Sequence, residues 1–381
     1  MSVFALLLLS APPLAEASAP QEFAKEARLI ARNVACAHDG EAVMDEVVVS
    51  AHCEKLRPKM ERYREQYGEK AAPFLAALSA GIDGPKVVYP FGGGDLISAI
   101  TTYGDAREWT TMSLEHAGDP RRLEGLDNKK LARSLGAIRE TIDGLLTYDD
   151  SKTENLQRVQ QGEIPGQVAF FLVALVVHGY EPVSLRYFRV QEDGSLAYLS
   201  ATDIAGLQKS NAGRLRRGMT VPDFSEAFSN SEIQFRRKGD PGAPLLVHRH
   251  IAADLSDGAL AKRPGLLRHL EAKGGVRAMT KAASYLLWRS DFSLIRNYLL
   301  DHLKIMISDS TGIPPKLLPK GFELTTYGGF TGSFLEADAT LNESLRAAYQ
   351  SGPPRALPFR YGYIDAAKKY HLMVLTRATE P

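Results

Sequence analysis

The segment from Lys86 to His116 constrains the fold more than any other part of the sequence. It contains a short run suited to a β-strand ("KVVYPF"), a turn ("GGGD"), a helical stretch ("DLISAITTYGDA") and a second strand-like run ("EWTTMSLEH"). Asp95 stands where a helix N-cap residue is expected. A strand, a Gly-rich turn, a helix and a strand within about 30 residues form a βαβ unit, whose two strands lie parallel in one sheet. We therefore predict an α/β fold.

The chain from residue 81 onward supplies further strands and helices for this sheet. Asp193-Gly194 is suited to a hairpin turn because it tolerates positive φ angles, so the sheet is predicted to be mixed. Other predicted strands lie in "HGYEPVSLRYFRV", "EIQFRRKGDPGAPLLVHRHIAADLSD", "KIMISDSTGIPP", "FELTTYGGF" and "KYHLMVLTRA". Predicted helices lie at 123–146 and in "VAFFLVALVV", "LLRHLEAKGGVRAMTKAASYLLW" and "DFSLIRNYLLDHL". Together they predict a Rossmann-like three-layer domain over residues 81–381, with a mixed, partly parallel sheet.

The region before this domain has a different pattern. Apolar residues recur at spacings of three and four from Gln21 to about Ala80, and "AGIDGPK" then interrupts the helical pattern. We predict a helical N-terminal segment over residues 20–80.

The first 19 residues have the features of a signal peptide. An apolar run from Val3 to Leu9 precedes Ala-x-Ala sequences that fit a cleavage site, although the first basic residue is Lys25 and none precedes the run. The alternative is an N-terminal core helix, which the clustered prolines disfavour. The apolar run at 168–177 has ten residues, whereas a transmembrane helix needs about 20. We predict an exported protein, periplasmic or on the cell surface, without a transmembrane segment.

The sequence contains two cysteines, Cys36 and Cys53. In an exported protein such a pair favours a disulfide, which would stabilise the fold by about 3 kcal/mol. Two buried thiols are the alternative. A zinc site with His38 or His52 is disfavoured because neither histidine has a recognised ligand spacing.

The charge distribution gives no sign of a polyanionic partner. The chain has 46 basic and 45 acidic residues and no long block of one sign. Short basic runs at 214–218 and 235–240 are typical of solvated loops. We predict binding neither to nucleic acid nor to an anionic membrane.

Polar residues follow four of the predicted strands. In an open α/β sheet, ligands bind at the carboxyl ends of the parallel strands. The candidate ligand-binding residues at these positions are Gly92, Gly93, Gly94, Asp95, Glu115, Asp254, Asp257 and Asp309. We predict that Asp95, Glu115 and Asp254 converge on a small polar ligand.

The glycine run and Glu115 have the spacing of a nucleotide-binding unit. There, glycine lets the backbone approach the ligand and the acid accepts hydrogen bonds from ribose hydroxyls. The full G-x-G-x-x-G pattern is absent because Ile97 occupies its last position. A purely structural turn is the alternative.

Other chemistry has weaker support. His248 and His250 stand two apart on a predicted strand, so both imidazoles face one side, as in strand-borne metal pairs; the alternative is that both lie on the surface. No G-x-S-x-G, H-E-x-x-H or P-loop motif occurs. "SDST" at 308–311 is typical of a hydrogen-bonded turn. Lys281, in a predicted apolar helix, is interpreted as a functional lysine with a lowered pKa or as a lysine that reaches water or pairs with a carboxylate. Arg296 is interpreted as an anchor for an anionic ligand or as a member of an ion pair.

Several blocks resemble known proteins. "YPFGGGD", "SLEHAGDPR", "KAASYLLW", "DFSLIRNYLL" and "SDSTGIP" are similar to a poorly characterised group of exported bacterial proteins with a YPF-(Gly/Ser)-Gly-x-Asp block. This resemblance covers roughly residues 80 to 375 and implies no activity. Residues 86–116 more distantly resemble class I S-adenosylmethionine-dependent methyltransferases, which implies cofactor contacts for Gly92, Gly94 and Glu115. S-adenosylmethionine is not expected outside the cytoplasm, so this implication conflicts with the signal peptide.

Three classes of function follow. The first is an exported protein that binds a small polar ligand at its strand ends. The second is a non-catalytic interaction module on a degenerate Rossmann fold, with its pocket filled by side chains such as Phe91 or Trp109. The third is a methyltransferase, if the chain is not exported. The sequence specifies neither a reaction nor a cofactor.

Overall fold

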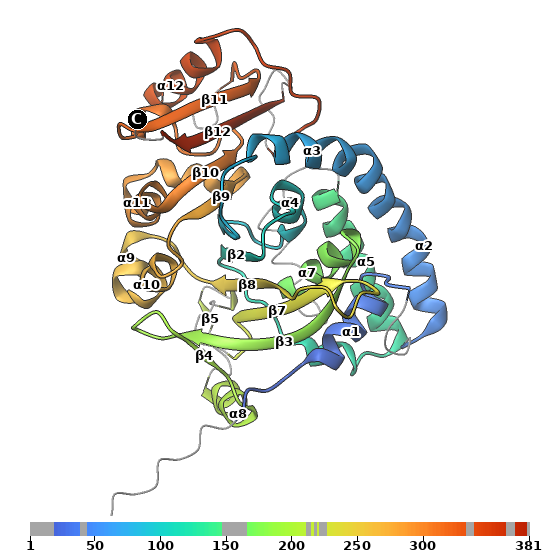
Figure 1. Cartoon of the computed structure of the whole chain (residues 1–381). Helices are drawn as coiled ribbons and strands as arrows, with labels where there is room; N and C mark the ends of the chain where they lie inside the picture. Colours follow the sequence, from blue (N-terminus) through green and yellow to red (C-terminus); the bar gives the residue numbers. More distant parts are fainter. Residues whose placement is uncertain are drawn as a thin grey trace, which may run out of the picture.

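The computed structural model describes residues 19–38, 44–146, 166–210, 215–216, 219–220, 227–332, 339–362 and 370–378. Its centre is a ten-stranded sheet in the order β11-β12-β10-β9-β1-β2-β8-β7-β3-β4 (Figure 1). These strands are β1 (Lys86–Pro90), β2 (Glu108–Ser113), β3 (Tyr180–Val190), β4 (Leu196–Tyr198), β7 (Asn230–Arg237), β8 (Leu246–Ala252), β9 (Val276–Thr280), β10 (Leu303–Ser308), β11 (Phe322–Gly328) and β12 (His371–Arg377). A separate two-stranded sheet joins β5 (Leu215–Arg216) and β6 (Met219–Thr220).

The large sheet is mixed, as predicted. Its five central strands, β10, β9, β1, β2 and β8, are parallel. At one end β12 lies antiparallel to both β10 and β11. At the other end β7, β3 and β4 continue the sheet as antiparallel neighbours. β3 and β4 are joined through Gly194, whose φ is +88°, so the predicted Asp-Gly hairpin is confirmed.

Helices cover both faces of this sheet. Alternate residues of β1 illustrate the two cores: Val87 and Tyr89 join one buried cluster, and Val88 joins the other. On the first face lie α1 (Ala24–Asn33), α2 (Glu46–Tyr63), α3 (Glu69–Leu78), α4 (Leu96–Thr102), α5 (Asn128–Leu146) and α7 (Gly166–Val177). On the second face lie α9 (Asp257–Lys262), α10 (Gly265–Glu271) and α11 (Ser293–His302). The predicted three-layer α/β architecture is therefore confirmed.

The remaining helices lie at the two ends of the sheet. α12 (Ala339–Gln350) packs against β11, and α8 (Ala201–Ser210) follows β4 (Figure 1). The short helical turns lie at Arg64–Gly68, Pro120–Leu123, Ala282–Trp288, Ser290–Phe292 and Pro315–Leu317.

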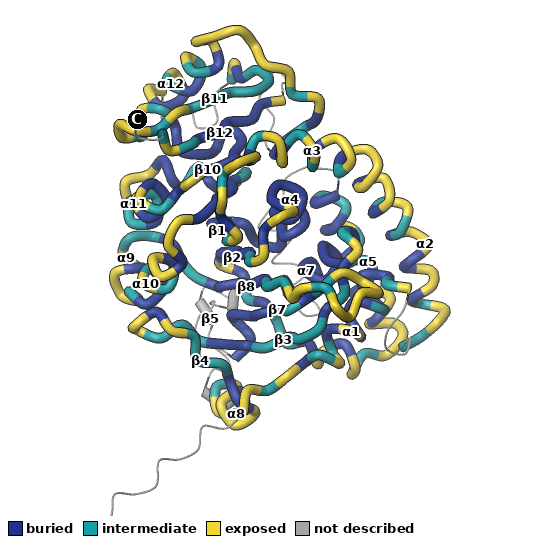
Figure 2. The backbone as a smooth tube through the Cα atoms, viewed as in Figure 1, coloured by how far each residue is buried: buried dark blue, intermediate teal, exposed yellow. Residues whose placement is uncertain are grey.

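The βαβ unit forms as predicted. β1 and β2 pair in parallel, and α4 connects them. The Asp95 carboxylate accepts a hydrogen bond from the backbone N–H of Ser98 at 3.3 Å, which is the interaction expected of an N-cap residue. Both strands and all of α4 are almost fully buried (Figure 2). The buried residues include the polar side chains of Thr101, Thr110 and Thr111.

The N-terminal helices share a core with the sheet. Side chains of α1, α2 and α3 belong to the same buried cluster as those of β1, β2 and β3. The predicted division at residue 80 stays a prediction.

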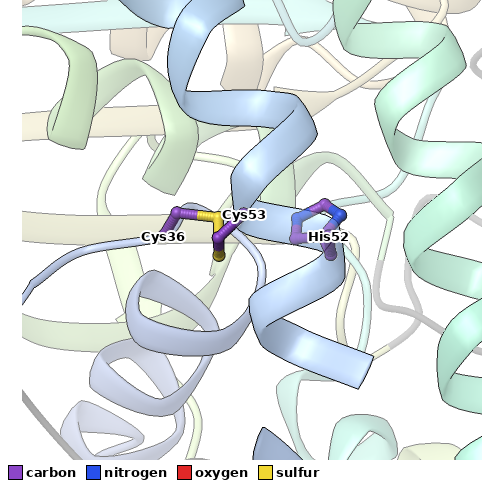
Figure 3. Close-up of side chains that lie close together, drawn as sticks. All are labelled: Cys36, His52 and Cys53. Carbon is purple, nitrogen blue, oxygen red and sulfur yellow. A yellow bond between two sulfur atoms is a disulfide. The ribbon is translucent and has the colours of Figure 1, made fainter. Parts of the chain in front are cut away.

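A disulfide joins the chain just after α1 to α2. Cys36 and Cys53 have an S–S distance of 2.04 Å and a Cα–Cα distance of 5.5 Å, so the predicted bridge is confirmed (Figure 3). His52 lies beside it, and its Nε2 is 2.9 Å from the carbonyl oxygen of Val34. The three residues are close enough to ligate a metal, but both sulfurs are used by the disulfide.

One central strand differs from the sequence prediction. "LLRHLEAKGGVRAMTKAASYLLW" was expected to be helical, yet it contains α10, then β9, then a 3₁₀ turn at Ala282–Trp288. All five residues of β9 are buried, so the strand lacks the alternation of polar and apolar residues that reveals a half-buried strand. As a result Lys281 lies at the end of a central strand rather than inside a helix.

No helix within the described ranges is long and apolar enough to cross a membrane. The predicted buried helix at 168–177 is α7, in which all residues but one are buried. Residues 1–18 of the predicted signal peptide lie outside the described residues.

Candidate functional site

The turn after β1 requires glycine at Gly92, Gly93 and Gly94 because of its backbone conformation and its close packing. Gly93 has a φ of +50°, and the N–H of Gly92 donates to the carbonyl of Met112 at 3.0 Å, which ties the turn to β2. A Cβ on Gly92 would stand 2.8 Å from the Tyr89 ring, and one on Gly94 would stand 2.5 Å from Oε1 of Gln167. Packing and backbone conformation thus explain this run without requiring a nucleotide.

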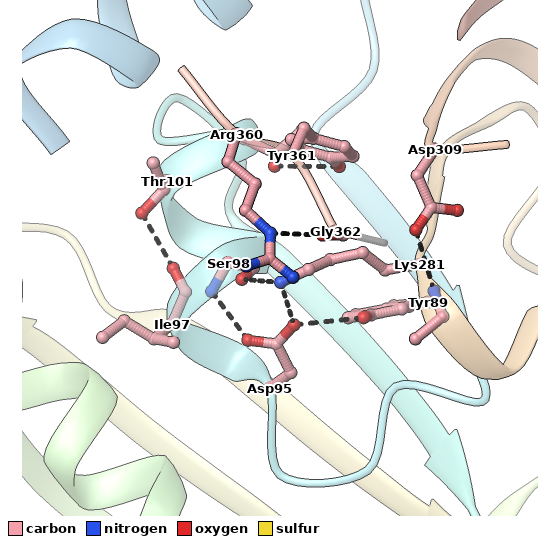
Figure 4. A network of polar contacts seen from close by, with 12 residues as sticks. Tyr89, Asp95, Ile97, Ser98, Thr101, Lys281, Asp309, Arg360, Tyr361 and Gly362 are labelled. Atoms are coloured by element: carbon pink, nitrogen blue, oxygen red, sulfur yellow. Dashed lines mark hydrogen bonds and ion pairs between the residues drawn. The ribbon is translucent and has the colours of Figure 1, made fainter. Parts of the chain in front are cut away.

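Asp95 belongs to a buried polar network at the strand ends (Figure 4). Its Oδ2 accepts hydrogen bonds from Lys281 Nζ and from the Tyr89 hydroxyl, both at 3.1 Å. Lys281 Nζ also donates to Ser98 Oγ at 2.9 Å. The Asp95 and Lys281 side chains are 3% and 12% exposed. Burial raises the pKa of Tyr89 well above its usual range, and the charge of Asp95 adds to the rise, so the phenol stays protonated and can donate.

Asp309, at the end of β10, lies next to the same network. Its Oδ2 accepts from the N–H of Ala282, the residue after Lys281, at 3.1 Å. Its Oδ1 accepts from the N–H of Thr311 at 2.9 Å. The chain after α12 crosses this edge at Gly362, where a Cβ would stand 2.3 Å from Asp309 Oδ2 and 2.7 Å from Lys281 Cγ (Figure 4). The Asp95–Lys281–Asp309 network is therefore tightly packed against the protein's own backbone.

Glu115 occupies the end of β2, where only 6% of the residue is exposed. Its hydrogen bonds use the backbone: the N–H donates to Ser113 Oγ at 3.3 Å, and the carbonyl accepts from His250 Nε2 at 2.7 Å. Within the described part of the chain, no hydrogen-bond donor or cation contacts its carboxylate. The carboxylate oxygens are not among the unpaired side-chain atoms that are cut off from solvent, so they can accept hydrogen bonds from a ligand.

His248 and His250 face the same side, as predicted, but that side is the core. Both are 0% exposed, and both contact the Thr111 hydroxyl, at 2.9 Å from His248 Nε2 and 3.1 Å from His250 Nδ1. The alternative of surface histidines is therefore wrong. Burial lowers the pKa of His250 to about 4 and holds the pKa of His248 well below its usual range, so both rings are neutral.

The neutral histidines form a directed chain of hydrogen bonds. A carbonyl oxygen only accepts, so His250 donates from Nε2 to Glu115, and its Nδ1 accepts from Thr111. Thr111 then accepts from Nε2 of His248. The chain holds the backbone at Glu115. A metal at this pair stays a weak prediction, because only Nδ1 of His248 is left without a partner.

The aspartates after β8 are engaged in local structure. Asp254 Oδ1 accepts from the N–H of Ser256 at 2.8 Å. Asp257 accepts from the N–H of Leu294 at 2.8 Å and from Ser293 Oγ at 2.5 Å, and thereby holds the start of α11 on the face opposite α4. The structure thus links Asp95 with Asp309, because Asp95 accepts from Lys281 Nζ and Asp309 accepts from the N–H of Ala282, the next residue. The convergence of Asp95, Glu115 and Asp254 stays a prediction.

The sequence analysis missed Gln167, in the first turn of α7. This residue is 0% exposed, and neither Nε2 nor Oε1 of its amide has a hydrogen-bond partner. Its backbone N–H donates to the carbonyl of His116 at 3.4 Å, next to Glu115, and its Oε1 lies against Gly94. The available signal was a single amide in an otherwise apolar run, "GQVAFFLVALVV".

Two cavities differ in their distance from the strand ends. An open groove of about 520 Å³ between α2 and α5 is lined mainly by charged residues and shares none with the strand ends. A cavity of about 10 Å³ touches Gly94 and is otherwise lined by apolar side chains of α4, α5 and α7, including Leu146 and Phe170.

The chain matches no protein-family model, no curated protein and no solved structure.

Proposed function

We propose that this is an exported protein that binds a small polar ligand at the carboxyl ends of β1 and β2. The Glu115 carboxylate carries the proposal, because it follows β2 and no donor among the described residues contacts it. A ligand with two neighbouring hydroxyl groups would supply those donors, as ribose does to the acid after the second strand of dinucleotide-binding folds. The glycine turn, whose backbone is tied to β2, lies beside this position.

The strand order supports the location. The chain proceeds from β1 to β2 and β8 on one side of β1, whereas β9 and β10 lie on the other side. β1 is therefore next to a switch in strand order, which is where open α/β sheets bind ligands. The β1–β9 side is occupied by Lys281, Tyr361 and Gly362 (Figure 4), which favours the β2 side.

The disulfide supports export. Disulfides persist in oxidising compartments and are rare in the cytoplasm. Cys36 and Cys53 are bonded. Together with the apolar N-terminal run and its Ala-x-Ala sequences, this favours a periplasmic or cell-surface location.

The test is a thermal-shift measurement with adenosine and with free ribose, because a ligand that binds only the folded state raises its stability. We expect a concentration-dependent rise in Tm for the wild type. Glu115→Gln should lose most of that rise, because an amide presents one acceptor where the carboxylate presents two. The matched control, Glu343→Gln on the exposed side of α12, should keep it. Absence of any rise, or an equal rise in Glu115→Gln, would contradict the proposal.

A second candidate is an S-adenosylmethionine-dependent methyltransferase. The strand order favours it: the series β8-β2-β1-β9-β10-β12-β11, in which β12 alone is antiparallel, resembles the sheet of class I methyltransferases. That cofactor requires a cytoplasmic protein. Mass spectrometry of the natural N-terminus separates the candidates: a chain cleaved near residue 19 supports export, and an intact cytoplasmic chain supports the methyltransferase.

An interaction module without a ligand is the third candidate. Trp109 is fully buried against Phe235, and Phe91 packs on Phe292. These contacts are expected of a pocket that the protein fills with its own side chains. The same thermal-shift series decides, since a filled site predicts no response to any probe.

A further inference from the structure

We propose that the groove between α2 and α5 is a second binding site, for a small molecule with a carboxylate or phosphate group, and that Arg139 holds this group. The groove has a volume of about 520 Å³, which is in the range of sites that bind small molecules. It shares no lining residue with the strand ends, so the inference goes beyond the proposed function and does not depend on it.

The walls of the groove are two helices that lie side by side (Figure 1). A hydrogen bond between Asn128 and Asp45 joins them where they begin. The lining residues run from Lys55 to Arg62 on α2 and from Gly136 to Asp143 on α5 at spacings of three and four, apart from Glu54 beside Lys55. Residues at these spacings share one face of a helix, so each wall is a single stripe of side chains.

The first ground for the proposal is the partly buried guanidinium of Arg139. Its Nη1 lies 2.9 Å from Nδ1 of His52, whose Nε2 donates to the carbonyl of Val34. Burial lowers the pKa of His52 to about 4, so this partner is a neutral acceptor. No carboxylate among the described residues lies within ion-pair distance of Arg139. The guanidinium thus lines the groove with its charge unpaired and most of its N–H donors unused.

The second ground is the distribution of charge. Lys55 and Arg62 stand on the opposite wall, and no carboxylate in the described part of the chain pairs with either. Lys59 is the exception, because it pairs with Asp143 at 2.7 Å. In total the lining contains four basic and three acidic residues. Unpaired cations therefore lie on both walls, which favours an anionic group between them.

The third ground is a pair of residues that disfavour helices. Pro58 lies inside α2 and Gly136 inside α5, although proline and glycine destabilise helix interiors more than any other residues. Neither is explained by packing or backbone conformation. Pro58 is exposed, Gly136 has no positive φ, and a Cβ on Gly136 would approach no side chain more closely than Nη2 of Arg139 at 3.8 Å. Both residues line the groove and keep it open.

The chemistry of the guanidinium selects the ligand group. Its N–H donors lie in one plane and match two oxygens of a carboxylate or a phosphate, and such charge-assisted pairs are stronger than neutral hydrogen bonds. Only one of its five N–H donors is used by His52. We therefore expect an oxyanion to bind at Arg139, and we expect added salt to weaken the binding by screening.

The experiment is isothermal titration of the full chain with succinate and with inorganic phosphate at low ionic strength. The wild type should bind at least one of these anions at a single site. Arg139→Gln should bind it at least about tenfold more weakly, because the amide carries no charge. Arg133→Gln removes the same charge from an exposed position on the same helix, outside the groove lining, and should bind as wild type does.

A second variant tests the groove itself. Leucine favours helices more than glycine does, so Gly136→Leu should have a Tm without ligand equal to or above that of the wild type. Its side chain would fill the groove, so binding of the anion should be lost. A variant that is at least as stable as the wild type but does not bind separates the site from any effect on folding.

Three results would overturn the proposal. They are binding of neither anion to the wild type, an affinity of Arg139→Gln or Gly136→Leu equal to that of the wild type, and an equal loss in Arg133→Gln, which would indicate a general effect of charge. If Arg139→Gln does not fold, Gly136→Leu still decides. Each of these results leaves the proposed ligand site at the strand ends unchanged.

Discussion

Replacing Asp95 by alanine tests whether the polar network at the strand ends stabilises the fold. The carboxylate holds Lys281 Nζ and the Tyr89 hydroxyl and also caps α4. Removing the carboxylate leaves the ammonium group of Lys281, whose side chain is 12% exposed, without its ion-pair partner. Loss of one partner of a buried ion pair costs about 3–5 kcal/mol, and loss of an N-cap about 1 kcal/mol. We expect Asp95→Ala to lower the free energy of unfolding by about 4–6 kcal/mol.

A double-mutant cycle separates the ion pair from the cap. In Asp95→Ala/Lys281→Met no ammonium remains, so the double variant should be more stable than Asp95→Ala alone, with a coupling of about 2 kcal/mol. The comparison is Asp143→Ala, which breaks the more exposed pair with Lys59 and should cost less than about 1 kcal/mol. Urea denaturation gives the four free energies. A double variant less stable than Asp95→Ala would refute the reasoning.

Three further predictions follow from the disulfide and the buried histidines. Cys36→Ala/Cys53→Ala should lower the free energy of unfolding by about 3 kcal/mol, and the wild type in reducing agent should lose the same amount; no change in either would contradict a stabilising bridge. His250 has a folded pKa of about 4 against 6.5 when exposed, so the folded state binds fewer protons between these values. Its contribution to the free energy of unfolding, up to about 3 kcal/mol, is complete above pH 6.5 and is lost as the pH falls towards 4. Urea titrations across that window should therefore show a free energy of unfolding that falls less steeply with decreasing pH in His250→Phe than in the wild type; an equal slope would contradict the prediction. Thr111→Val keeps the shape but leaves nitrogens of His248 and His250 without partners, so we expect a loss of about 2 kcal/mol by the same assay.

Features set by neighbouring residues were predictable from the sequence. The cap at Asp95, the hairpin at Gly194 and the parallel pairing of β1 with β2 follow from local patterns, and the cysteine spacing fitted a short disulfide loop. The cap and the hairpin depend on backbone preferences that act over a few residues, and the parallel pairing follows from the connection of two strands through a helix.

Features set by tertiary packing were not predictable. β9 is buried along its whole length, so only the preceding glycines mark its boundary, and Lys281 was assigned to a helix as a consequence. The partner of Lys281, Asp95, is 186 residues away in sequence. The missing partners of Glu115 and Gln167 become visible only when the surrounding side chains are in place, and the same holds for the burial of His248 and His250.

The most direct test of the proposed ligand site is a crystal structure of the protein grown with adenosine. The proposal predicts the ribose hydroxyls at about 3 Å from the Glu115 carboxylate, next to the turn at Gly92–Asp95. Adenosine bound elsewhere, or a Glu115 carboxylate that stays without a ligand contact at saturating adenosine, would contradict it.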